Sequence, residues 1–481
     1  FLFDTFLRFY NKLLGLTYLC YYFLTRWGFK ERVIDGKSTS HDSIFLSSYF
    51  YNLDLGKAKK GFYFSRQWGE LPQYLNSIGQ NTFHLENYIK SPEIPNLRDA
   101  KKIRKRFNDI GGLNNHIFLD QHLSMKFFLN ILLTYFKIIS KPINIKLIRP
   151  AFDVRKSKLN LWPLMKDDWF SSVGGKNMVA NLIWLRLFNS HLESISYQKL
   201  GFYLCENMGW ERALIHAWKS NGHGKLVAVP HSTIRFWDLR YFFDPRSYNT
   251  KMKNNLPMPD LVAVNGSAAM RAYLGGNYPA SDLLEVEALR YLYLAEYSVA
   301  APKVKRPTGG PLSVLAMGDY LLDNTQLQMR LLEQAATLLP QDTVFVIKPH
   351  PYCPVNPADY PELSMTVTME PLSTLLAKCD IAYSSSLTAA AVDAYCMGVP
   401  IISVLDPSKL NMSPLIGYEG VTFVSSPEEL AAVLNKIDDI KEIQEQGKDY
   451  FYLEAKLPRW RELLINNGKA RNKIVLKEVL K

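Results

Sequence analysis

The chain has 481 residues, of which 47% are apolar and 21% charged, a composition that excludes a disordered or fibrous protein. Its net charge of +12 favours anionic partners: nucleic acid, anionic lipid headgroups, or phosphorylated and carboxylated sugars. The length exceeds what one hydrophobic core ordinarily serves, so we expect two or three domains.

The cysteines are scattered and form neither a C-x-x-C pair nor a His/Cys spacing typical of a metal site. This pattern is typical of a reducing compartment and predicts a cytoplasmic protein without structural zinc. We recognise no secretory signal, and because the sequence begins at Phe1 its true N-terminus is undefined. The five cysteines are Cys20, Cys205, Cys353, Cys379 and Cys396.

Two apolar stretches near the start, residues 13–24 and 127–136, are shorter than the roughly 20 apolar residues that span a bilayer. We expect both to be packing helices. The alternative is that they lie on a membrane surface, since aromatic and basic residues flank them. The basic run KKIRKRF at 101–107 likewise indicates either a solvated helix face or a patch for a membrane or another polyanion.

From about residue 40, short apolar runs alternate with helical stretches on both sides of an irregular, basic middle region. Strands separated by helices of this length predict right-handed βαβ units and a parallel sheet. The expected strands are 43–50, 81–87, 199–207, 225–232 and 259–266, and the expected helices include 70–79 and 209–224.

Residues 299–311 have the prolines, glycines and cations of a linker, and a second alternating series follows them. The predicted domains are therefore 1–298, with helical insertions, 299–455, and a helical tail at 456–481. The expected strands are 312–318, 343–347, 380–386, 399–404 and 420–426, and the expected helices are 325–339, 373–379, 387–398 and 427–437.

The predicted fold class is α/β and GT-B-like, with two Rossmann-like, doubly wound domains facing each other across a cleft. Ligands bind outside the carboxyl ends of the strands in such sheets. Many glycosyltransferases use this arrangement, as do some epimerases and phosphotransferases. Neither half has G-x-G-x-x-G after its first strand, and G-x-x-x-x-G-K-[ST] is absent, which argues against dinucleotide redox chemistry and P-loop NTPases.

Two strand ends of the second half carry groups suited to a phosphate. The strand at 343–347 ends in Lys348 and His350, and the strand at 380–386 ends in Ser384, Ser385 and Ser386, just before Thr388. Hydroxyls and free N–H groups at a helix N-terminus attract anions, and a cation and an imidazole beside them would bind a nucleotide phosphate. The alternative is an ordinary strand end and serines that cap a helix.

Glu370 lies between these strand ends and precedes the helix predicted at 373–379. Its carboxylate could bind the two ribose hydroxyls of a nucleotide, or it could simply complement the dipole of that helix.

KPHP at 348–351, followed by YSSSLTAAAVDAYCMGVPII at 383–402, resembles the His-Pro and Ser-Ser motifs of enzymes that use cytidine-monophosphate-activated acidic sugars. These include bacterial sialyltransferases, polysialyltransferases and transferases of Kdo, 3-deoxy-manno-octulosonic acid. The resemblance implies that His350, Ser384 and Ser385 contact the phosphate and that Glu370 contacts the ribose. CDP-glycerol phosphotransferases of the teichoic-acid type carry a similar pair, so the motifs leave the transferred group open.

Residues 203–245, together with RQWGELP at 66–72 and VEALRY at 286–291, resemble a family of bacterial surface-carbohydrate biosynthesis proteins. Through that family the chain resembles the retaining β-Kdo transferases.

The N-terminal half offers the candidate catalytic groups. Glu206 and His231 lie at the carboxyl ends of consecutive strands, where both should project into the cleft. Glu206 is the predicted nucleophile of a retaining reaction or the base of an inverting one, with Glu211 and Asp238 as further candidates. The structural alternatives are an interdomain salt bridge for Glu206, a first-turn helix acid for Glu211 and a satisfied core histidine for His231.

Arg235 and Arg240 follow on a loop, and a guanidinium binds a donor or acceptor carboxylate through two hydrogen bonds. We expect no obligatory metal, because Lys348 and His350 can neutralise the phosphate, and no cofactor beyond the nucleotide-sugar donor.

The sequence thus predicts a glycosyltransferase that moves Kdo or a related ulosonic acid from a CMP donor onto a surface polysaccharide or lipid-linked glycan. We expect it in the cytoplasm, either free or at the inner face of the membrane, with no nucleic-acid partner. The alternatives are a CDP-glycerol or CDP-ribitol phosphotransferase and a non-catalytic scaffold of a polysaccharide assembly complex.

Overall fold

The computed structural model describes residues 2–30, 43–110, 114–154, 156–248, 255–296, 310–436 and 450–466. Most of the linker predicted at 299–311 and the later part of the tail predicted at 456–481 lie outside these ranges.

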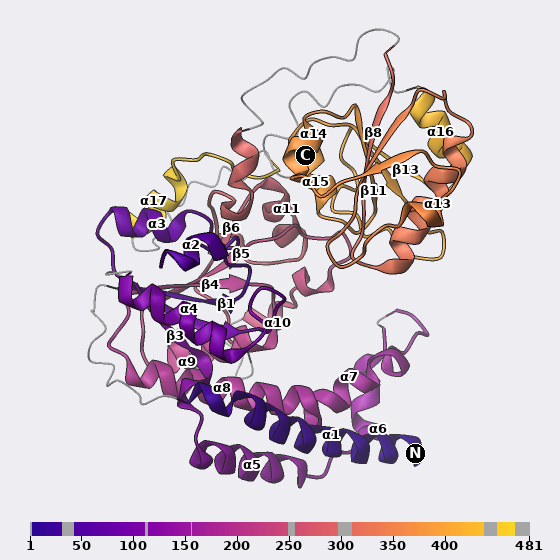
Figure 1. The fold of residues 1–481 in the computed structure, drawn as a ribbon. Helices are drawn as coiled ribbons and strands as arrows, with labels where there is room; N and C mark the ends of the chain where they lie inside the picture. The colour runs from indigo at the N-terminus through magenta and orange to yellow at the C-terminus, as the bar shows by residue number, and fades with distance from the viewer. Residues whose placement is uncertain are drawn as a thin grey trace. The chain divides into compact units, whose positions relative to one another are not determined.

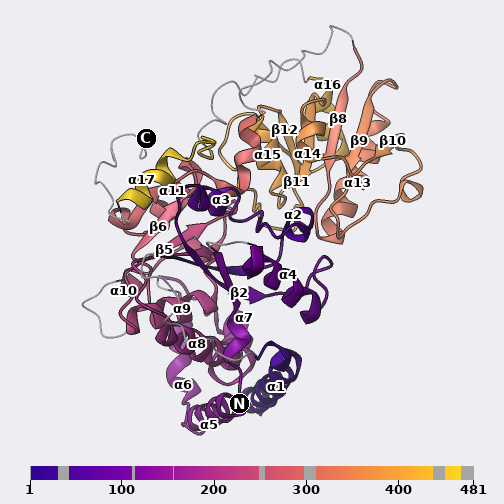
Figure 2. The same cartoon turned by 60° about the vertical axis from the view of Figure 1, so that its left-hand side comes forward.

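The fold consists of two Rossmann-like sheets with helices packed against them, which confirms the predicted α/β class (Figures 1 and 2). The first sheet has the order β3-β2-β1-β4-β5-β6-β7, and its pairs β1–β2, β2–β3, β1–β4 and β6–β7 are parallel. Its strands are β1 (Ile44–Phe50), β2 (Thr82–Tyr88), β3 (Asn114–Phe118), β4 (Leu200–Cys205), β5 (Lys225–Pro230), β6 (Leu261–Val264) and β7 (Leu283–Glu285).

The second sheet has the order β10-β9-β8-β11-β12-β13, and all five of its strand pairs are parallel. Helix α13 (Leu322–Ala336) packs against β11, and α15 (Ala390–Cys396) packs against β11 and β12. The strands are β8 (Ser313–Met317), β9 (Val344–Lys348), β10 (Met365–Val367), β11 (Ile381–Ser385), β12 (Ile401–Val404) and β13 (Val421–Val424).

The chain forms two compact units that do not coincide with the predicted domains. Unit 1 comprises Phe1–Val229 and Arg246–Leu261, and unit 2 comprises Pro230–Pro245 and Val262–Lys481. The strands of the two sheets, in contrast, separate between β7 and β8, where the linker was expected. Because the two criteria differ, the domain boundary at residue 298 stays a prediction.

Unit 1 carries a layer of four helices, α1 (Leu2–Arg26), α5 (Met125–Ile139), α7 (Trp162–Gly174) and α8 (Lys176–Ser194) (Figure 1). Both apolar stretches predicted as packing helices lie in this layer. The Tyr135 hydroxyl of α5 donates to the carbonyls of Lys12 and Gly174, both at 2.8 Å. A Cβ at Gly15 would meet that hydroxyl at 2.8 Å, so only glycine allows this close approach. In the described part of the chain, no helix is long and apolar enough to cross a membrane.

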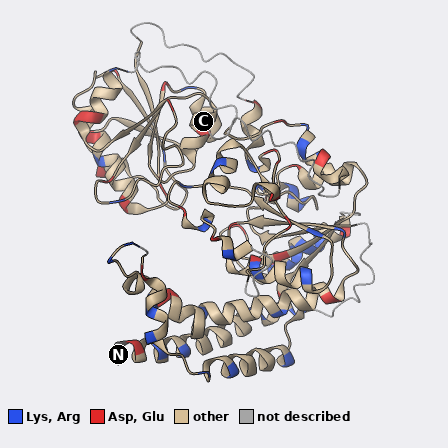
Figure 3. Cartoon of the chain, turned by 180° about the vertical axis from the view of Figure 1, so that it is seen from behind, with Lys and Arg blue, Asp and Glu red and all other residues tan. Residues whose placement is uncertain are grey.

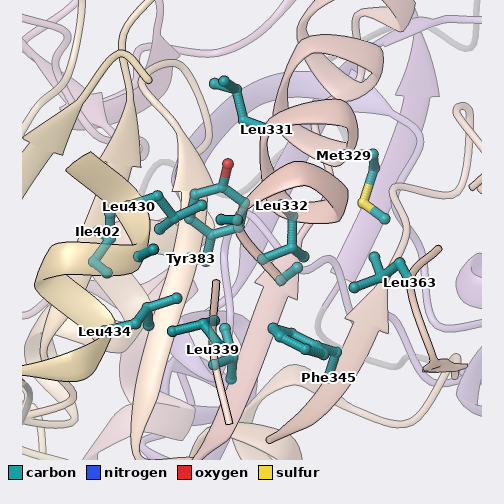
Figure 4. Packing of buried hydrophobic residues seen from close by; sticks show 14 of the residues in the cluster. Met329, Leu331, Leu332, Leu339, Phe345, Leu363, Tyr383, Ile402, Leu430 and Leu434 are labelled. Atoms are coloured by element: carbon teal, nitrogen blue, oxygen red, sulfur yellow. The ribbon is translucent and has the colours of Figure 1, made fainter. Parts of the chain in front are cut away.

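One hydrophobic cluster of unit 2 includes α15, and another lies between the second sheet and helices α13 and α16 (Pro427–Asn435) (Figure 4). Leu332, Leu430 and Ile402 are fully buried there, and the Tyr383 hydroxyl donates to the carbonyl of Gln328 at 2.9 Å. Burying one such aliphatic side chain contributes about 1.5 to 3 kcal/mol, so this cluster fixes the sheet whose strand ends carry the site.

The segment after β7 is held by the C-terminal helix α17 (Pro458–Ile465), also part of unit 2. The carboxylate of Glu287 accepts the backbone N–H groups of Arg459 at 2.9 Å and Trp460 at 3.1 Å. A carboxylate at a helix N-terminus satisfies free N–H groups and complements the helix dipole. The contact anchors the chain just before the 3₁₀ helix η7 (Leu289–Leu294).

Candidate functional site

Three neighbouring strands of the second sheet end in polar residues. β8 leads into Asp319, β9 ends two residues before His350, and β11 ends at Ser385. β8 lies between β9 and β11. Because the carboxyl ends of parallel strands share one edge of a sheet, the three side chains start from the same edge.

A pocket of about 450 Å³ lies within unit 2 and is lined by residues that follow these strands. The loop after β5 and the helix η7 line it as well. Three arginines contribute to its wall, and we therefore call it the arginine pocket. Its lining consists of Ser232, Thr233, Arg235, Asp238, Arg240, Arg290, Tyr291, Tyr293, Tyr320, His350, Leu387, Thr388, Ala389, Ala390 and Asp393.

Asp238 and Arg240 are paired with each other in this pocket. Arg240 donates from Nε to Oδ1 of Asp238 at 2.9 Å and from Nη2 to Oδ2 at 2.7 Å. Burial raises the pKa of Asp238, but the hydrogen bonds and charge of Arg240 outweigh it and the pKa is lowered overall. Because Asp238 uses its oxygens on Arg240, its place fits a positioning role better than the predicted catalytic one.

Arg235 and Arg290 bring two further guanidinium groups to the pocket. Arg290 lies on η7, exposed, with its guanidinium 5.7 Å from the centre of the Tyr291 ring. Three arginines against the two carboxyl groups of Asp238 and Asp393 leave an excess of positive charge. Such a wall suits an anionic ligand with more than one charged group.

His350 presents an N–H group, as the geometry of its ring shows. The backbone N–H of Tyr352 donates to its Nδ1 at 3.2 Å, so the proton of the neutral ring is on Nε2. Burial lowers the pKa of His350, and the charge of Asp319 opposes that shift only in part. The ring is therefore neutral near pH 7, and Nε2 can donate to a phosphate oxygen.

Asp393 is a buried acid in the same pocket, on α15. The Tyr293 hydroxyl donates to its Oδ2 at 2.6 Å, whereas Oδ1 has no hydrogen-bond partner among the described residues. Burial, opposed by Tyr293 and Arg290, raises its pKa to about 6. A carboxyl group with such a pKa can accept or release a proton near neutral pH.

The predicted serines are divided among different places. Ser384 is fully buried and its Oγ lies 3.1 Å from that of Ser403, so its hydroxyl is not exposed to a ligand. Ser385 donates to the carboxylate of Asp319, and its Oγ accepts the N–H of Leu387 at 3.3 Å. These contacts order the turn, and the phosphate-binding role of Ser385 stays a prediction.

Ser385 and Ser386 line an adjoining pocket of about 270 Å³, which shares Leu387 with the arginine pocket. The two predicted corners of the donor site therefore meet at Leu387 without lining one common pocket. The helix predicted from Leu387 begins only at Ala390 and is seven residues long, so its dipole contributes less than expected.

The other predicted donor residues also differ in their placement. Thr388 lines the arginine pocket, as the prediction requires. Lys348 and Glu370 are absent from its lining; Glu370 is exposed and lies 3.6 Å from Lys378. Burial lowers the pKa of Lys348. The donor roles of Lys348 and Glu370 stay predictions.

In unit 1, Glu211 caps the helix α9 (Gly209–Ser220). Its carboxylate accepts the backbone N–H groups of Glu206 at 2.8 Å, Asn207 at 3.1 Å and Met208 at 3.0 Å. Burial raises its pKa to about 7 against the lowering effect of these hydrogen bonds. The structural alternative, a first-turn acid, therefore describes Glu211 better than a catalytic role.

Glu206 is half-buried at the end of β4. Burial and then the Glu206 carboxylate raise the pKa of Tyr49, whose hydroxyl accepts the indole N–H of Trp210 at 2.7 Å. Glu206 thus lies beside Tyr49 at the carboxyl edge of the first sheet, and its catalytic role stays a prediction.

His231 is buried and does not line either pocket described so far. Burial and then the charge of Arg290 lower its pKa to about 3. It is a neutral core group close to Arg290, in keeping with the structural alternative for this residue.

The sequence prediction missed Asp319, Arg290 and Asp393 as site residues. Asp319 has a recognisable signal, because it follows a buried strand at its carboxyl end in the same way as His350. Arg290 lies within the VEALRY stretch but on no strand end, and Asp393 occurs inside an apolar helix. Only the folded arrangement brings those two into the pocket.

An apolar pocket of about 380 Å³ shares the loop residues Ser232, Thr233, Arg235 and Asp238 with the arginine pocket. We call it the aromatic pocket. Its further aromatic lining is Phe236, Trp237, Tyr241, Phe242, Tyr418, Tyr450 and Phe451.

No protein-family model and no curated protein sequence matches this chain. Among solved structures, the calicheamicin glycosyltransferase CalG4 is similar over 89% of this chain and 96% of its own, with 11% identity and a TM-score of 0.46. MurG of Acinetobacter baumannii matches over 89% and 100%, with 9% identity and a TM-score of 0.43. UDP-GlcNAc 2-epimerase from Neisseria meningitidis, bound to UDP-GlcNAc, matches over 88% and 100%, with 10% identity and a TM-score of 0.46. Likenesses this distant carry no argument about activity.

Proposed function

We propose that the protein is a glycosyltransferase that moves an acidic sugar, Kdo or a related ulosonic acid, from a CMP-activated donor to a glycan acceptor. One observation carries the proposal: the arginine pocket brings His350 and Thr388 together with Arg235, Arg240 and Arg290. Two residues predicted to bind the donor phosphate, His350 and Thr388, thus line the same cavity as the arginines predicted to bind the carboxylate.

The charge of this pocket suits such a donor. A CMP-linked ulosonic acid carries two anionic groups, the phosphate and the sugar carboxylate. The arginines can bind the carboxylate through paired hydrogen bonds, while the Nε2–H of His350 stabilises the leaving phosphate.

The aromatic pocket gives the acceptor a place beside the donor. Its aromatic rings offer flat apolar surface for the apolar faces of sugar rings. Because the loop 232–238 lines both pockets, an acceptor bound there would lie next to the donor.

In the proposed reaction, the Glu206 carboxylate attacks the anomeric carbon, the bond to the donor phosphate breaks, and CMP leaves with the electron pair. An acceptor hydroxyl then attacks the same carbon, releases Glu206 and passes its proton to Asp393. Two displacements retain the anomeric configuration. This reaction requires Glu206 of unit 1 to reach the pocket of unit 2 in the working enzyme.

We propose further that the acceptor is lipid-linked and that helices α1 and α5 rest on the inner surface of the membrane. The exposed side of α1 is apolar, with Phe9 69% and Leu24 79% exposed. Figure 3 shows few charged residues along both helices. Lys126 and Lys137 of α5 can contact anionic headgroups beside the apolar side chains. The exposed apolar side chains are Phe6, Phe9, Tyr10, Leu13, Leu14, Tyr21 and Leu24 on α1, and Met125, Leu129, Leu133 and Phe136 on α5.

A donor panel tests the chemistry. The protein is incubated with CMP-Kdo, CMP-sialic acid, CDP-glycerol and UDP-sugars, and nucleotide release is measured with and without a glycan acceptor. CMP release from an acidic-sugar donor, lost in Arg290→Ala, supports the proposal. Turnover of CDP-glycerol alone indicates the phosphotransferase, and thermal stabilisation by UDP but not CMP contradicts both.

Vesicle flotation tests the membrane face separately. We expect the protein to bind vesicles that contain anionic lipid. The double variant Phe9→Glu with Leu13→Glu should weaken this binding at least about tenfold, because it places charges on the apolar face. The matched control is Phe62→Glu, a similarly exposed phenylalanine of unit 1 outside these helices. Unchanged flotation, or a dimer that the double variant dissociates, contradicts the lipid assignment.

A further inference from the structure

A second polar cluster lies in unit 1, on strands β2 and β3 at the edge of the first sheet. His84 and His116 are directly paired across the two strands, and Glu86 follows His84 by two residues. Because side chains alternate along a strand, His84 and Glu86 point to the same face. Three groups that commonly bind metal ions therefore share one small area of the sheet.

The cluster is compact and fully buried. All three side chains are 0% exposed, and their potential ligand atoms lie within 4.8 Å of one another. The two imidazole rings are stacked with centroids 4.1 Å apart, and Nδ1 of His116 lies 3.3 Å from Oε2 of Glu86.

Hydrogen bonds determine which nitrogen of His84 carries the proton. The Thr82 hydroxyl donates to Oδ1 of Asn114 at 2.6 Å, so its oxygen can only accept from Nε2 of His84, 3.0 Å away. Nε2 is therefore protonated, and Nδ1 has a free lone pair. An imidazole whose second nitrogen donates to a fixed oxygen is the arrangement found around metal-bound histidines.

Three atoms of the cluster have no hydrogen-bond partner among the described residues: Nδ1 of His84, Oε1 of Glu86 and Nε2 of His116. Buried polar atoms are nearly always paired, and leaving one unpaired is costly. Three such atoms side by side indicate a missing common partner. Once Glu86 is ionised, its Oε2 accepts the Nδ1–H of His116, so all three unpaired atoms offer lone pairs and their partner should be a cation.

We propose that His84, Glu86 and His116 bind one divalent transition-metal ion, with zinc the best fit to two imidazoles and one carboxylate. Since no side chain of the cluster is exposed, the ion would stabilise the pairing of β2 and β3 rather than contact a substrate. This site departs from the expectation of a metal-free protein and does not depend on the proposed transferase activity.

The electrostatics of the cluster agree with a bound cation. Burial is the main cause that lowers the pKa values of His84 and His116, and the charge of Arg104 lowers that of His116 further. Both imidazoles are therefore neutral, the form that binds metals. Burial raises the pKa of Glu86, against the effects of the Tyr63 hydroxyl and Arg104. A dication would instead keep Glu86 ionised, and the Tyr63 hydroxyl or a water molecule could complete the coordination.

The alternative is a metal-free polar cluster in which Glu86 is protonated. Metal analysis of the natively purified protein distinguishes the two. We expect about one zinc ion per chain in the wild type, and less than about a tenth of that in His116→Gln and Glu86→Gln, which each lose one ligand. The matched control is His191→Gln: His191 is also buried, but its Nε2 bonds to the carbonyl of Leu119 at 2.8 Å outside the cluster.

Refolding provides a second measurement, because a buried ion exchanges slowly in the native state. The protein is unfolded in denaturant with chelator, dialysed, and refolded with or without zinc. We expect zinc to raise the midpoint of thermal unfolding by about 5 °C or more in the wild type and in His191→Gln, but not in His116→Gln. The proposal is overturned if the native protein holds only background metal and refolds to the same thermal midpoint with and without zinc. It is also overturned if His116→Gln keeps the full metal content.

Discussion

Each unit contains a buried acid in the first turn of a helix, and the two acids are used differently. Glu211 in unit 1 accepts three backbone N–H groups, whereas Asp393 in unit 2 accepts one tyrosine hydroxyl and lines the arginine pocket. Burial raises both pKa values, to about 7 and about 6. A raised pKa alone therefore does not identify a catalytic acid. The hydrogen-bond partners of the carboxyl group distinguish Glu211 from Asp393.

The largest expected difference is in turnover. Asp393→Asn should lower kcat about 10²- to 10⁴-fold with little change in donor binding, because a positioned general base contributes that much. Glu211→Gln should leave the kcat of correctly folded enzyme within about threefold, since its carboxylate orders the backbone before α9 and lines neither the arginine pocket nor the aromatic pocket. Steady-state kinetics normalised to active-site concentration measures both. If Glu211→Gln lowered kcat more than Asp393→Asn did, the proton transfer would be assigned to unit 1.

The next largest effect is on the pH dependence of stability. The folded-state pKa of Asp393, about 6, lies above the ordinary aspartate value of about 3.9, so the wild type loses stability as pH rises from about 4 through 6. Asp393→Asn removes this loss and should be about 3 kcal/mol more stable, relative to wild type, at pH 7.5 than at pH 4, as about 1.4 kcal/mol corresponds to one pKa unit. Urea unfolding at both pH values tests this. A difference that does not change with pH would show that folding leaves the pKa of Asp393 unshifted.

A smaller loss of stability is expected when the helix cap of α9 is removed. Glu211→Gln keeps one acceptor oxygen but replaces the other with an amide that cannot accept the remaining N–H group. We expect a loss of about 1 to 2 kcal/mol in the free energy of unfolding at pH 8, where the wild-type carboxylate is ionised. Glu70→Gln, at a helix start where the side chain makes no capping hydrogen bond, is the control. Equal losses in the free energy of unfolding in the two variants would contradict the role of Glu211 as the cap of α9.

The sequence predicts the sheets well because buried parallel strands are continuous apolar runs, as at 226–230 and 261–264. It misses β3, which begins with two asparagines, and β7 and β10, which have only three residues each. Each is held by pairing with a neighbouring strand, and that pairing leaves no periodic signal in its own residues.

Strand ends make part of the site predictable, and tertiary contacts decide the rest. His350 and Thr388 were predicted and do line the pocket, whereas Ser384 is turned into the core by its pairing with Ser403 on β12. Arg290 reaches the pocket because Glu287 ties η7 to the C-terminal helix, a contact between residues more than 170 positions apart. The residues on either side of Glu287 and Arg459 in the sequence do not indicate such a contact.

The smallest predicted effect concerns Asp238, which competes with a ligand for Arg240. The pair is partly exposed, so Asp238→Asn should change the free energy of unfolding by less than about 1 kcal/mol. If Arg240 binds the donor carboxylate, freeing its guanidinium should lower the KM for an acidic-sugar donor about two- to fivefold while kcat stays constant. Comparison of Arg240→Lys with Asp238→Asn shows whether donor binding depends on the positive charge at position 240 or on the paired hydrogen bonds. Lysine keeps the charge but loses the paired hydrogen bonds. An unchanged KM in both variants would remove Arg240 from the donor site and leave carboxylate binding to Arg235 and Arg290.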